Sequence, residues 1–496
     1  MNGPVLTRRQ FGSAAGGFVI AFSMAPRLAS AAEAAKRLPG TLEANRRLDS
    51  WLRVDPEGTV TVSSGRVELG QGATTALAQI AAEELDIAFI RIRMIPVDTS
   101  RSPNEGVTAG SNSIEVGGAA LRSAAAEARA ILIDLASQRL AVPSDQLIAD
   151  DGLIFTKDGA KKTSYWELAA ANPLAREATN SAPAKPPKDH KVVGQSIQRL
   201  DIADKVMGRP VFIQDLRLPG MVFGRVVRPV SYGAELTKLD DTAVRKMPGV
   251  ISVVRDGRFI GVVAEREEQA IAARTALAKA AVWKNPANLP EPANVHEFLK
   301  TRPDIDTKTV NEKAGSAAPA VKTVEATYRK PYLAHASIGP SCGVAGFIDN
   351  QLTVWSHTQG PYPLRADIAK ATGLPPEKVR VIHTPGAGCY GHNGADDAAF
   401  DAAMLSINSN GRLVKLQWMR DDEFGWEPFG SAMTMTARAG LSADGTIVDW
   451  QYDVWSCTHN MRPGNRQGVN LLGAWHLEKP LARAVPAEAP LPAGGG

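Results

Sequence analysis

The sequence has few cysteines and no pattern among them that would hold a metal ion or a cluster. Its three cysteines, Cys342, Cys389 and Cys457, are too few and too far apart for a disulfide framework. Because no CxxC pair occurs, we expect neither an iron–sulfur cluster nor a structural zinc ion in this chain. The histidines form no HxH or HxxxH pair, and we expect the acidic runs 396–397 and 421–423 to be solvated faces. The sequence therefore predicts no metal site.

Long apolar runs and runs of one charge are also missing. After the first thirty residues no stretch approaches 18 consecutive apolar residues, so we expect no transmembrane helix. The 56 basic and 52 acidic residues give a net charge of +4, and no basic stripe is interleaved with aromatic residues. Nucleic acid is therefore not an expected partner. A chain of 496 residues with 44% hydrophobic residues has the size and composition of about three globular domains.

The first residues have the three parts of an export signal in the usual order. The paired arginines Arg8 and Arg9 precede the weakly apolar run 12–24, and the small residues 29–31 offer a cleavage site. This pattern is typical of a twin-arginine signal, which exports folded proteins. We therefore expect residues 1–31 to be a leader and the mature protein to be periplasmic. The alternative is an ordinary alanine-rich helix.

Composition and periodicity divide the rest of the chain into units. We expect a first unit at 45–173, a small unit at 195–284, a third unit at 321–478, and a linker-like tail at 479–496. The proline-rich stretch 174–190 is interpreted as a linker. Strands and helices do not strictly alternate in the small unit, although they alternate in the third, and the predicted fold class is α+β.

Two glycine-containing turns precede predicted helices in the first unit. Gly70, Gln71 and Gly72 lie between a strand and a helix, where backbone N–H groups at the helix start are available to an anion. Gly110 and Ser111 lie in a polar loop before a long helix, and could cap that helix or bind an anion. The alternatives are a tight turn without a ligand and a plain polar loop.

Two further turns lie in the third unit. Residues 386–391 match G-x-G-x-x-G between a strand and a helix, as in a dinucleotide-binding fold. A ribose-binding acid should follow about 20 residues later at the end of a second strand, whereas the nearest such acids, Asp421 and Asp422, lie some thirty residues past Gly391, so the nicotinamide interpretation stays weak. Gln359 and Gly360 follow a strand, where the amide can donate to a ligand oxygen. A turn that only leads into a helix is the alternative.

Taken together, several blocks in one order resemble the molybdenum-binding large subunits of the xanthine dehydrogenase/aldehyde oxidase family. Their order is most similar to the isoquinoline 1-oxidoreductase β-subunit group, and two blocks are similar to nicotinate dehydrogenase-like members. The blocks are 65–72, 108–111, 332–342, 358–360 with 364–365, and 386–394. The resemblance implies a molybdopterin-binding architecture with an inserted small α+β, hammerhead-like module at 195–284.

The resemblance also implies a cofactor, a reaction and a set of site residues. It implies molybdopterin cytosine dinucleotide, and hydroxylation of a small molecule at an aldehyde carbon or a carbon beside a ring nitrogen, with oxygen from water. If the roles of the family's residues are transferred to the matching positions, Gln359, followed by Gly360, would hydrogen-bond an oxo ligand of molybdenum. Gly388, Tyr390 and Gly391 would line the other side of the metal. Gly70, Gln71 and Gly72, with Gly110 and Ser111, would hold the pterin or its pyrophosphate.

No catalytic residue is assigned by the resemblance. The family's catalytic base is a glutamate near the end of a longer chain, so we expect this chain to be C-terminally truncated and inactive alone; Glu423 is the one acid worth considering in its place. Electrons would leave through a small partner chain with two [2Fe–2S] clusters, with a cytochrome c as a further acceptor. The competing hypotheses are a non-catalytic remnant without molybdenum and a nicotinamide-dependent oxidoreductase that uses 386–391.

Overall fold

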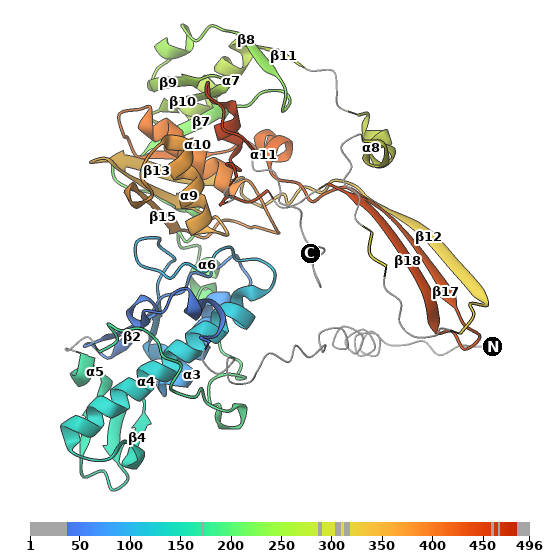
Figure 1. The fold of residues 1–496 in the computed structure, drawn as a ribbon. Helices are drawn as coiled ribbons and strands as arrows, with labels where there is room; N and C mark the ends of the chain where they lie inside the picture. The colour runs from blue at the N-terminus through green and yellow to red at the C-terminus, as the bar shows by residue number, and fades with distance from the viewer. Residues whose placement is uncertain are drawn as a thin grey trace.

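The computed structural model describes residues 37–169, 173–285, 290–302, 309–311, 318–457, 461–464 and 467–483. The expected leader 1–31 and most of the expected tail lie outside the described residues. Helices and strands are mixed along the chain, and the fold is α+β. Figure 1 shows two lobes and a long strand ribbon. Within the described residues no helix is long and apolar enough to cross a membrane.

The first lobe is built around two helices and two small sheets. The strands β1 (Leu52–Asp55), β2 (Thr59–Val62) and β3 (Ile92–Met94) form one sheet, in which β2 and β3 are parallel and α3 (Ala73–Leu85) connects them. The long helix α4 (Ala119–Leu140) follows a π-helical turn at Ser113–Gly118 and packs beside α3. The strands β4 (Leu147–Asp150), β5 (Leu153–Thr156) and β6 (Lys162–Ser164) precede the short helix α5 (Tyr165–Leu168). Trp51, Leu77 and Leu121 lie in the common core.

The second lobe is organised by one seven-stranded sheet in the order β15-β14-β13-β16-β7-β10-β9. Its strands are β7 (Val222–Val227), β9 (Val250–Asp256), β10 (Phe259–Ala264), β13 (Cys342–Ile348), β14 (Gln351–Ser356), β15 (Val379–His383) and β16 (Val414–Gln417). Because β16 pairs in parallel with β7, the expected module at 195–284 and the unit at 321–478 share this sheet. The boundary drawn from the sequence is therefore not a boundary between sheets.

Helices cover this sheet and connect its strands. The helix α10 (Ala395–Ile407) crosses β13 so closely that a Cβ at Gly343 would lie 2.6 Å from the Cα of Ala399. The helix α9 (Pro361–Thr372) connects β14 to β15, and α7 (Glu267–Ala280) packs against β7 and β10. The remaining elements are α6 (Ile202–Val206), α8 (Val295–Thr301), α11 (Arg420–Trp426) and the strand pair β8 (Glu235–Leu239) and β11 (Ala281–Lys284).

A three-stranded ribbon projects away from both lobes (Figure 1). It consists of β12 (Lys322–Lys330), β17 (Met433–Leu441) and β18 (Ile447–Ser456), all antiparallel, with β17 in the middle. Its strands are the longest in the described part of the chain.

The proline-rich stretch that we expected to be a linker is bound along the first lobe. The carboxylate of Glu127 on α4 accepts N–H bonds from Thr179 and Asn180, and that of Glu84 on α3 accepts one from Lys185 at 3.0 Å. Buried carboxylates thus hold this segment through its backbone, which proline content alone does not reveal.

The two lobes meet along the edge strand β15. The N–H of Thr99 donates to the carbonyl of Val381 at 3.0 Å, and the N–H of His383 donates to the carbonyl of Val97 at 2.8 Å. The ion pair of Asp98 with Arg380 reinforces this pairing. The contact brings the loops of the first lobe to the carboxyl ends of β14 and β15.

Candidate functional site

The carboxyl ends of β14 and β15 meet at one edge of the sheet because these neighbouring strands run parallel. Residues 357–360 leave β14 there, and residues 384–394 leave β15 beside them, with the N–H of Thr384 bonded to the carbonyl of Ser356 at 3.0 Å. The edge of an α/β sheet where such loops emerge is a common place for a ligand. The predicted residues on both loops are therefore brought together.

Gln359 joins this edge to the first lobe. Its Nε2 donates to the carbonyl of Thr108 at 2.9 Å, while the N–H of Thr108 donates to the Gln359 carbonyl at 2.8 Å. Its Oε1 accepts a bond from Nη1 of Arg462 at 2.7 Å. The side chain is buried, and the second N–H of Nε2 has no acceptor among the described residues. Gln359 is thus fixed in orientation with one donor to spare. Arg462 is a contact that sequence reasoning missed, and no motif marks it.

The turn 386–394 leaves its backbone donors open. The backbone has φ of 114° at Gly388, 57° at Tyr390 and 138° at Gly391. The N–H groups of residues 388–391 have no acceptor among the described residues, while the turn's own carbonyls accept from Cys389 Sγ and from Asn393 Nδ2. Successive open N–H groups in such a turn, followed by a helix start, suit an anionic or oxygen-rich ligand.

The loop at 108–111 also keeps open donors. Gly110 and Ser111 have φ of 61° and 59°, and their N–H groups have no acceptor among the described residues. Thr108, directly before them, is bonded to Gln359 and, through its hydroxyl, to the N–H of Val67 at 3.0 Å. The structure therefore places the predicted loop beside the predicted glutamine.

The first glycine turn differs because its donors are already filled. The carboxylate of Glu68 accepts N–H bonds from Gly70 at 2.8 Å, Gly72 at 2.9 Å and Thr74 at 3.1 Å. The side chain of Gln71 is also engaged, with Oε1 accepting from the N–H of Leu69 and Nε2 donating to the carbonyl of Val67. The expectation of free N–H groups at this helix start is thus not met. The available signal was an acid two residues before the first glycine.

A buried histidine lies between this turn and the sheet edge. The Nδ1 of His383 lies 3.1 Å from the carbonyl oxygen of Thr358, and its Nε2 lies 3.1 Å from that of Glu68. Burial lowers the pKa of His383 to about 4, although both carbonyls oppose the shift. The imidazole is therefore neutral at pH 7 and positions the first turn next to Thr358.

The loop 335–341 lies against the open turn. The N–H of Gly339 donates to the carbonyl of Ala387 at 3.1 Å, and Asn393 Nδ2 donates to the hydroxyl of Ser337 at 2.9 Å. A Cβ at Gly391 would lie 2.4 Å from Cδ2 of His335, so the ring lies directly on that glycine. The loop therefore forms a wall of the site, and His335 is a wall residue that sequence reasoning assigned no role.

Two buried glutamates hold that loop, Glu423 within α11 and Glu427 directly after it. Glu423 accepts from the N–H of Ser341 at 2.7 Å and from its hydroxyl at 3.0 Å, and Glu427 accepts from the N–H of Ala336 at 3.0 Å. Burial, together with the neighbouring Glu427, raises the pKa of Glu423 to about 7. Because Glu423 is fully buried and bonded to the loop, it acts as a positioning group in this structure and not as an exposed base.

The acidic runs are not the solvated faces that we expected. Asp396 and Asp397 on α10, and Asp422 on α11, are all buried. Asp397 accepts from the N–H of Leu472 at 2.6 Å, and burial raises its pKa to about 7. Asp422 pairs with Arg274 at 2.8 Å. The run 421–423 begins at Asp421, whose side chain is the exposed exception. No group of three or more metal-ligating side chains forms among the described residues.

Residues 339–343 match G-x-S-x-G literally, but they do not form a nucleophile elbow. Such an elbow places an exposed serine between a strand and a helix. Here Ser341 is fully buried, precedes a strand, and donates its hydroxyl to Glu423. The serine is therefore a structural residue of the loop.

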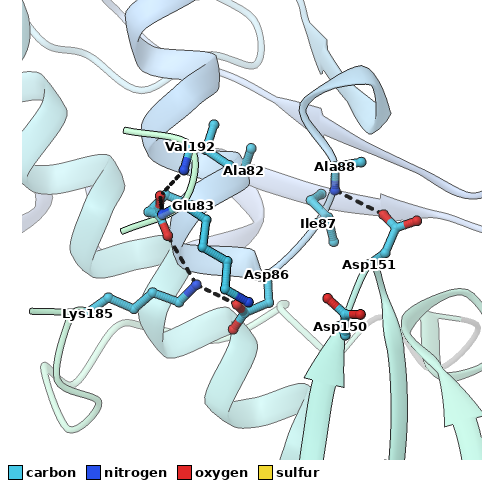
Figure 2. Close-up of a pocket in the computed structure, with 10 residues that line it drawn as sticks. Ala82, Glu83, Asp86, Ile87, Ala88, Asp150, Asp151, Lys185 and Val192 are labelled. Atoms are coloured by element: carbon cyan, nitrogen blue, oxygen red, sulfur yellow. Dashed lines mark hydrogen bonds and ion pairs between the residues drawn. The ribbon is translucent and has the colours of Figure 1, made fainter. Parts of the chain in front are cut away.

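A cavity of about 200 Å³ in the first lobe lies apart from these residues (Figure 2). Its lining includes Glu83, Asp86 and Lys185, and Lys185 bridges the two acids. Burial opposes ionisation of Glu83, but N–H bonds from residues 191–193 outweigh it and hold its pKa below the usual value. No predicted site residue lines this cavity, and Glu83, Asp86 and Lys185 already have partners.

Two models of the molybdopterin cofactor-binding domain match the chain, at residues 13–194 and 292–478. The chain belongs to the xanthine dehydrogenase/aldehyde oxidase family through these molybdopterin cofactor-binding domains. All four predicted turns lie in the matched regions, so the separate blocks belong to these two domains.

Two relatives in sequence support the assignment, and both are longer than this chain. It is 38% identical over 419 residues to one of the nicotinate dehydrogenase subunits of Pseudomonas putida, a match that covers 82% of the chain and 35% of that protein. It is 26% identical to the β chain of isoquinoline 1-oxidoreductase of Brevundimonas diminuta, covering 90% of the chain and 64% of that protein. Among solved structures, aldehyde oxidoreductase of Desulfovibrio gigas matches with a TM-score of 0.44 and 16% identity, covering 77% of this chain and 44% of that one.

Proposed function

We propose that the chain is the molybdenum-cofactor-binding part of an oxidoreductase that hydroxylates an aldehyde carbon, or a carbon beside a ring nitrogen, with oxygen from water. The observation that carries this proposal is the junction at the sheet edge. There a fixed amide with one spare donor, Gln359, belongs to the same edge as a turn with open N–H groups at 388–391. The names of the relatives, which include nicotinate, isoquinoline and aldehyde enzymes, supply the substrate classes.

The residues present fit such a cofactor by their donors. The spare N–H of Gln359 suits an oxygen ligand of the metal, and the N–H groups at 388–391 suit the opposite side. Gly110 and Ser111 offer N–H groups to a pyrophosphate, and they follow a residue bonded to Gln359. Gly70, Gln71 and Gly72 stay predicted contacts; the N–H groups of both glycines would first have to leave Glu68.

The bound cofactor would supply the two-electron oxidation and transfer of an oxygen atom that derives from water. The chain's own residues orient it and shape the wall beside it. Gln359 is held by Thr108 and Arg462, and the wall loop 335–341 is held by Glu423 and Glu427. No residue of the chain is assigned as the base, because Glu423 and Glu427 are both buried and bonded to the wall loop.

Further parts of the proposal concern the whole enzyme. The chain spans 35% and 64% of the two relatives above. We therefore propose that further polypeptide supplies the catalytic base. The cysteines offer no cluster site, so electrons would pass to a partner with [2Fe–2S] clusters and then to a cytochrome c. The paired arginines at the start support export to the periplasm, and the cytosine dinucleotide is the proposed cofactor form.

No observation in the described part of the chain favours the nicotinamide-dependent alternative. Asp421 and Asp422, the acids considered for the ribose, lie on α11 and pair with Arg274. They are thus engaged away from any ribose.

The test is the molybdenum content per polypeptide of the protein purified from its native host, with the nucleotide released and the co-purifying chains identified. We expect near-stoichiometric molybdenum, cytosine nucleotide and an iron–sulfur partner, and a Gln359→Ala variant with less metal. No metal in protein from cells that load other molybdenum enzymes would overturn the proposal and favour the non-catalytic remnant.

A further inference from the structure

One face of the ribbon is apolar over its central rows, with Lys322 and Lys330 of β12 at its two ends. Because directly paired residues of antiparallel strands point to the same side, the register of β12, β17 and β18 sorts their side chains into two faces. Three rows of three form the apolar face: Val324, Ala439 and Trp450; Ala326, Ala437 and Tyr452; Tyr328, Met435 and Val454. No charged side chain interrupts these rows, so the face is a continuous apolar surface.

The opposite face is polar, and a helix of this chain lies against one end of it. Its side chains include Thr327, Thr436 and Asp453 in one row. The helix α8 lies against it, with Glu297 bonded to Arg329, His296 near Thr434, and Lys300 over the ring of Trp455. The chain thus packs its own helix on the polar face.

The apolar face stays exposed in the described part of the chain. Its outer side chains are Val324 (48% exposed), Tyr328 (58%), Trp450 (58%), Tyr452 (50%) and Val454 (46%). Side chains of this size, each about half exposed, leave on the order of 400 Å² of apolar surface, the size of a functional patch on a monomer. A sheet with such a face requires a covering layer.

We propose that this face, the rows defined above, is the docking surface for the polypeptide that corresponds to the part of the relatives that this chain does not span. The match covers only 35% of the nicotinate dehydrogenase relative, so that protein has ample sequence outside it to form a covering layer. The three rows contain no charge, and the lysines of this face, Lys322 and Lys330, lie only at its ends, so an apolar partner suits the rows better than a nucleic acid does. The occupant is an apolar helix or sheet face, packed about 10 Å above the ribbon.

The inference rests on the family assignment and not on the proposed reaction, so it is tested without molybdenum. A photo-crosslinking amino acid is placed at Tyr452 in the full chain, produced in its native host. The matched control carries it at Gln451, the adjacent residue on the polar face. We expect position 452, and not 451, to crosslink to a polypeptide whose sequence matches the unspanned part of the relatives.

Paired substitutions separate loss of docking from loss of folding. In a chain with the crosslinker at Trp450, Tyr452→Lys should reduce the yield of that crosslink at least about tenfold, because a lysine charge would be buried. Asp453→Lys, on the polar face, should leave the yield unchanged, with both proteins matching the wild type by circular dichroism. Crosslinks only to a second copy, equal labelling from 451, or no crosslink from 452 would each overturn the proposal.

Discussion

The glycine turn at 70–72, the first turn, and the glycine turn at 386–391, the third turn, have the same local plan. They differ in whether their backbone N–H groups already have an acceptor. Each follows a strand or extended segment, contains two glycines with positive φ, and leads into a helix of 13 residues, α3 or α10. In the first, the N–H groups of Gly70 and Gly72 donate to Glu68. In the third, the N–H groups of 388–391 have no acceptor among the described residues.

The difference comes from one position. Two residues before the first glycine with positive φ stands Glu68 in one turn and Gly386 in the other. A glutamate there reaches forward and satisfies the helix start as an anion would, whereas glycine has no side chain to do so. Glycine spacing therefore sets the shape of such a turn, while the neighbouring side chain decides whether it is open to a ligand.

The largest effect is expected from Gly391→Ala in the open turn. The new Cβ would lie 2.4 Å from His335 Cδ2, and φ of 138° is unfavourable for alanine. We expect the molybdenum content of native-host protein to fall at least about tenfold, since a strain of about 2–4 kcal/mol displaces the turn. The double variant Gly391→Ala/His335→Ala, which removes the clash, should recover part of the metal. No recovery would mean that His335 is not the obstacle.

Sequence patterns predicted the local elements better than their assembly. The helix expected after Gly72 and the long helix expected after Ser111 are confirmed, because each depends on neighbouring residues. The pairing of β16 with β7 depends on residues almost two hundred positions apart, which periodicity does not encode. For the same reason Arg462, which orients Gln359, was missed as a partner. Glu68 lies only two residues before Gly70, so its role in the first turn was a local signal that was overlooked.

A smaller effect is expected from Glu68→Ala, which would convert the first turn toward the state of the third. Removing the carboxylate leaves three N–H groups without their acceptor, and the cost should be about 2–4 kcal/mol in the free energy of unfolding. Denaturant unfolding measures it, and Glu57→Ala, at an exposed position of the same lobe, is the control. Inorganic phosphate should raise the melting temperature of Glu68→Ala more than that of the wild type; equal shifts would argue against a shared plan.

Behind the open turn, Glu423→Gln should change how stability depends on pH. The folded-state pKa of about 7 lies above the ordinary value of 4.5, so the folded state binds the proton more tightly. This contribution is present below pH 4.5 and is lost as the pH rises through 7, by roughly 1–3 kcal/mol. The glutamine variant should lack it, as seen in the variant-minus-wild-type difference across this range. A difference that stays constant with pH would contradict the raised pKa.

The smallest effect is expected from Gly70→Ala, the counterpart of Gly391→Ala in the filled turn. Gly70 has φ of 107°, but a Cβ there meets nothing within 4 Å, so only backbone strain of about 1 kcal/mol opposes the change. Unfolding should detect that loss, while molybdenum content should stay at the wild-type level, because the adjacent donors face Glu68 and not a ligand. If Gly70→Ala lost metal as fully as Gly391→Ala, the filled turn would have to open when the cofactor binds. Gly70 would then be a cofactor contact after all, and Glu68 would be the group that the cofactor displaces.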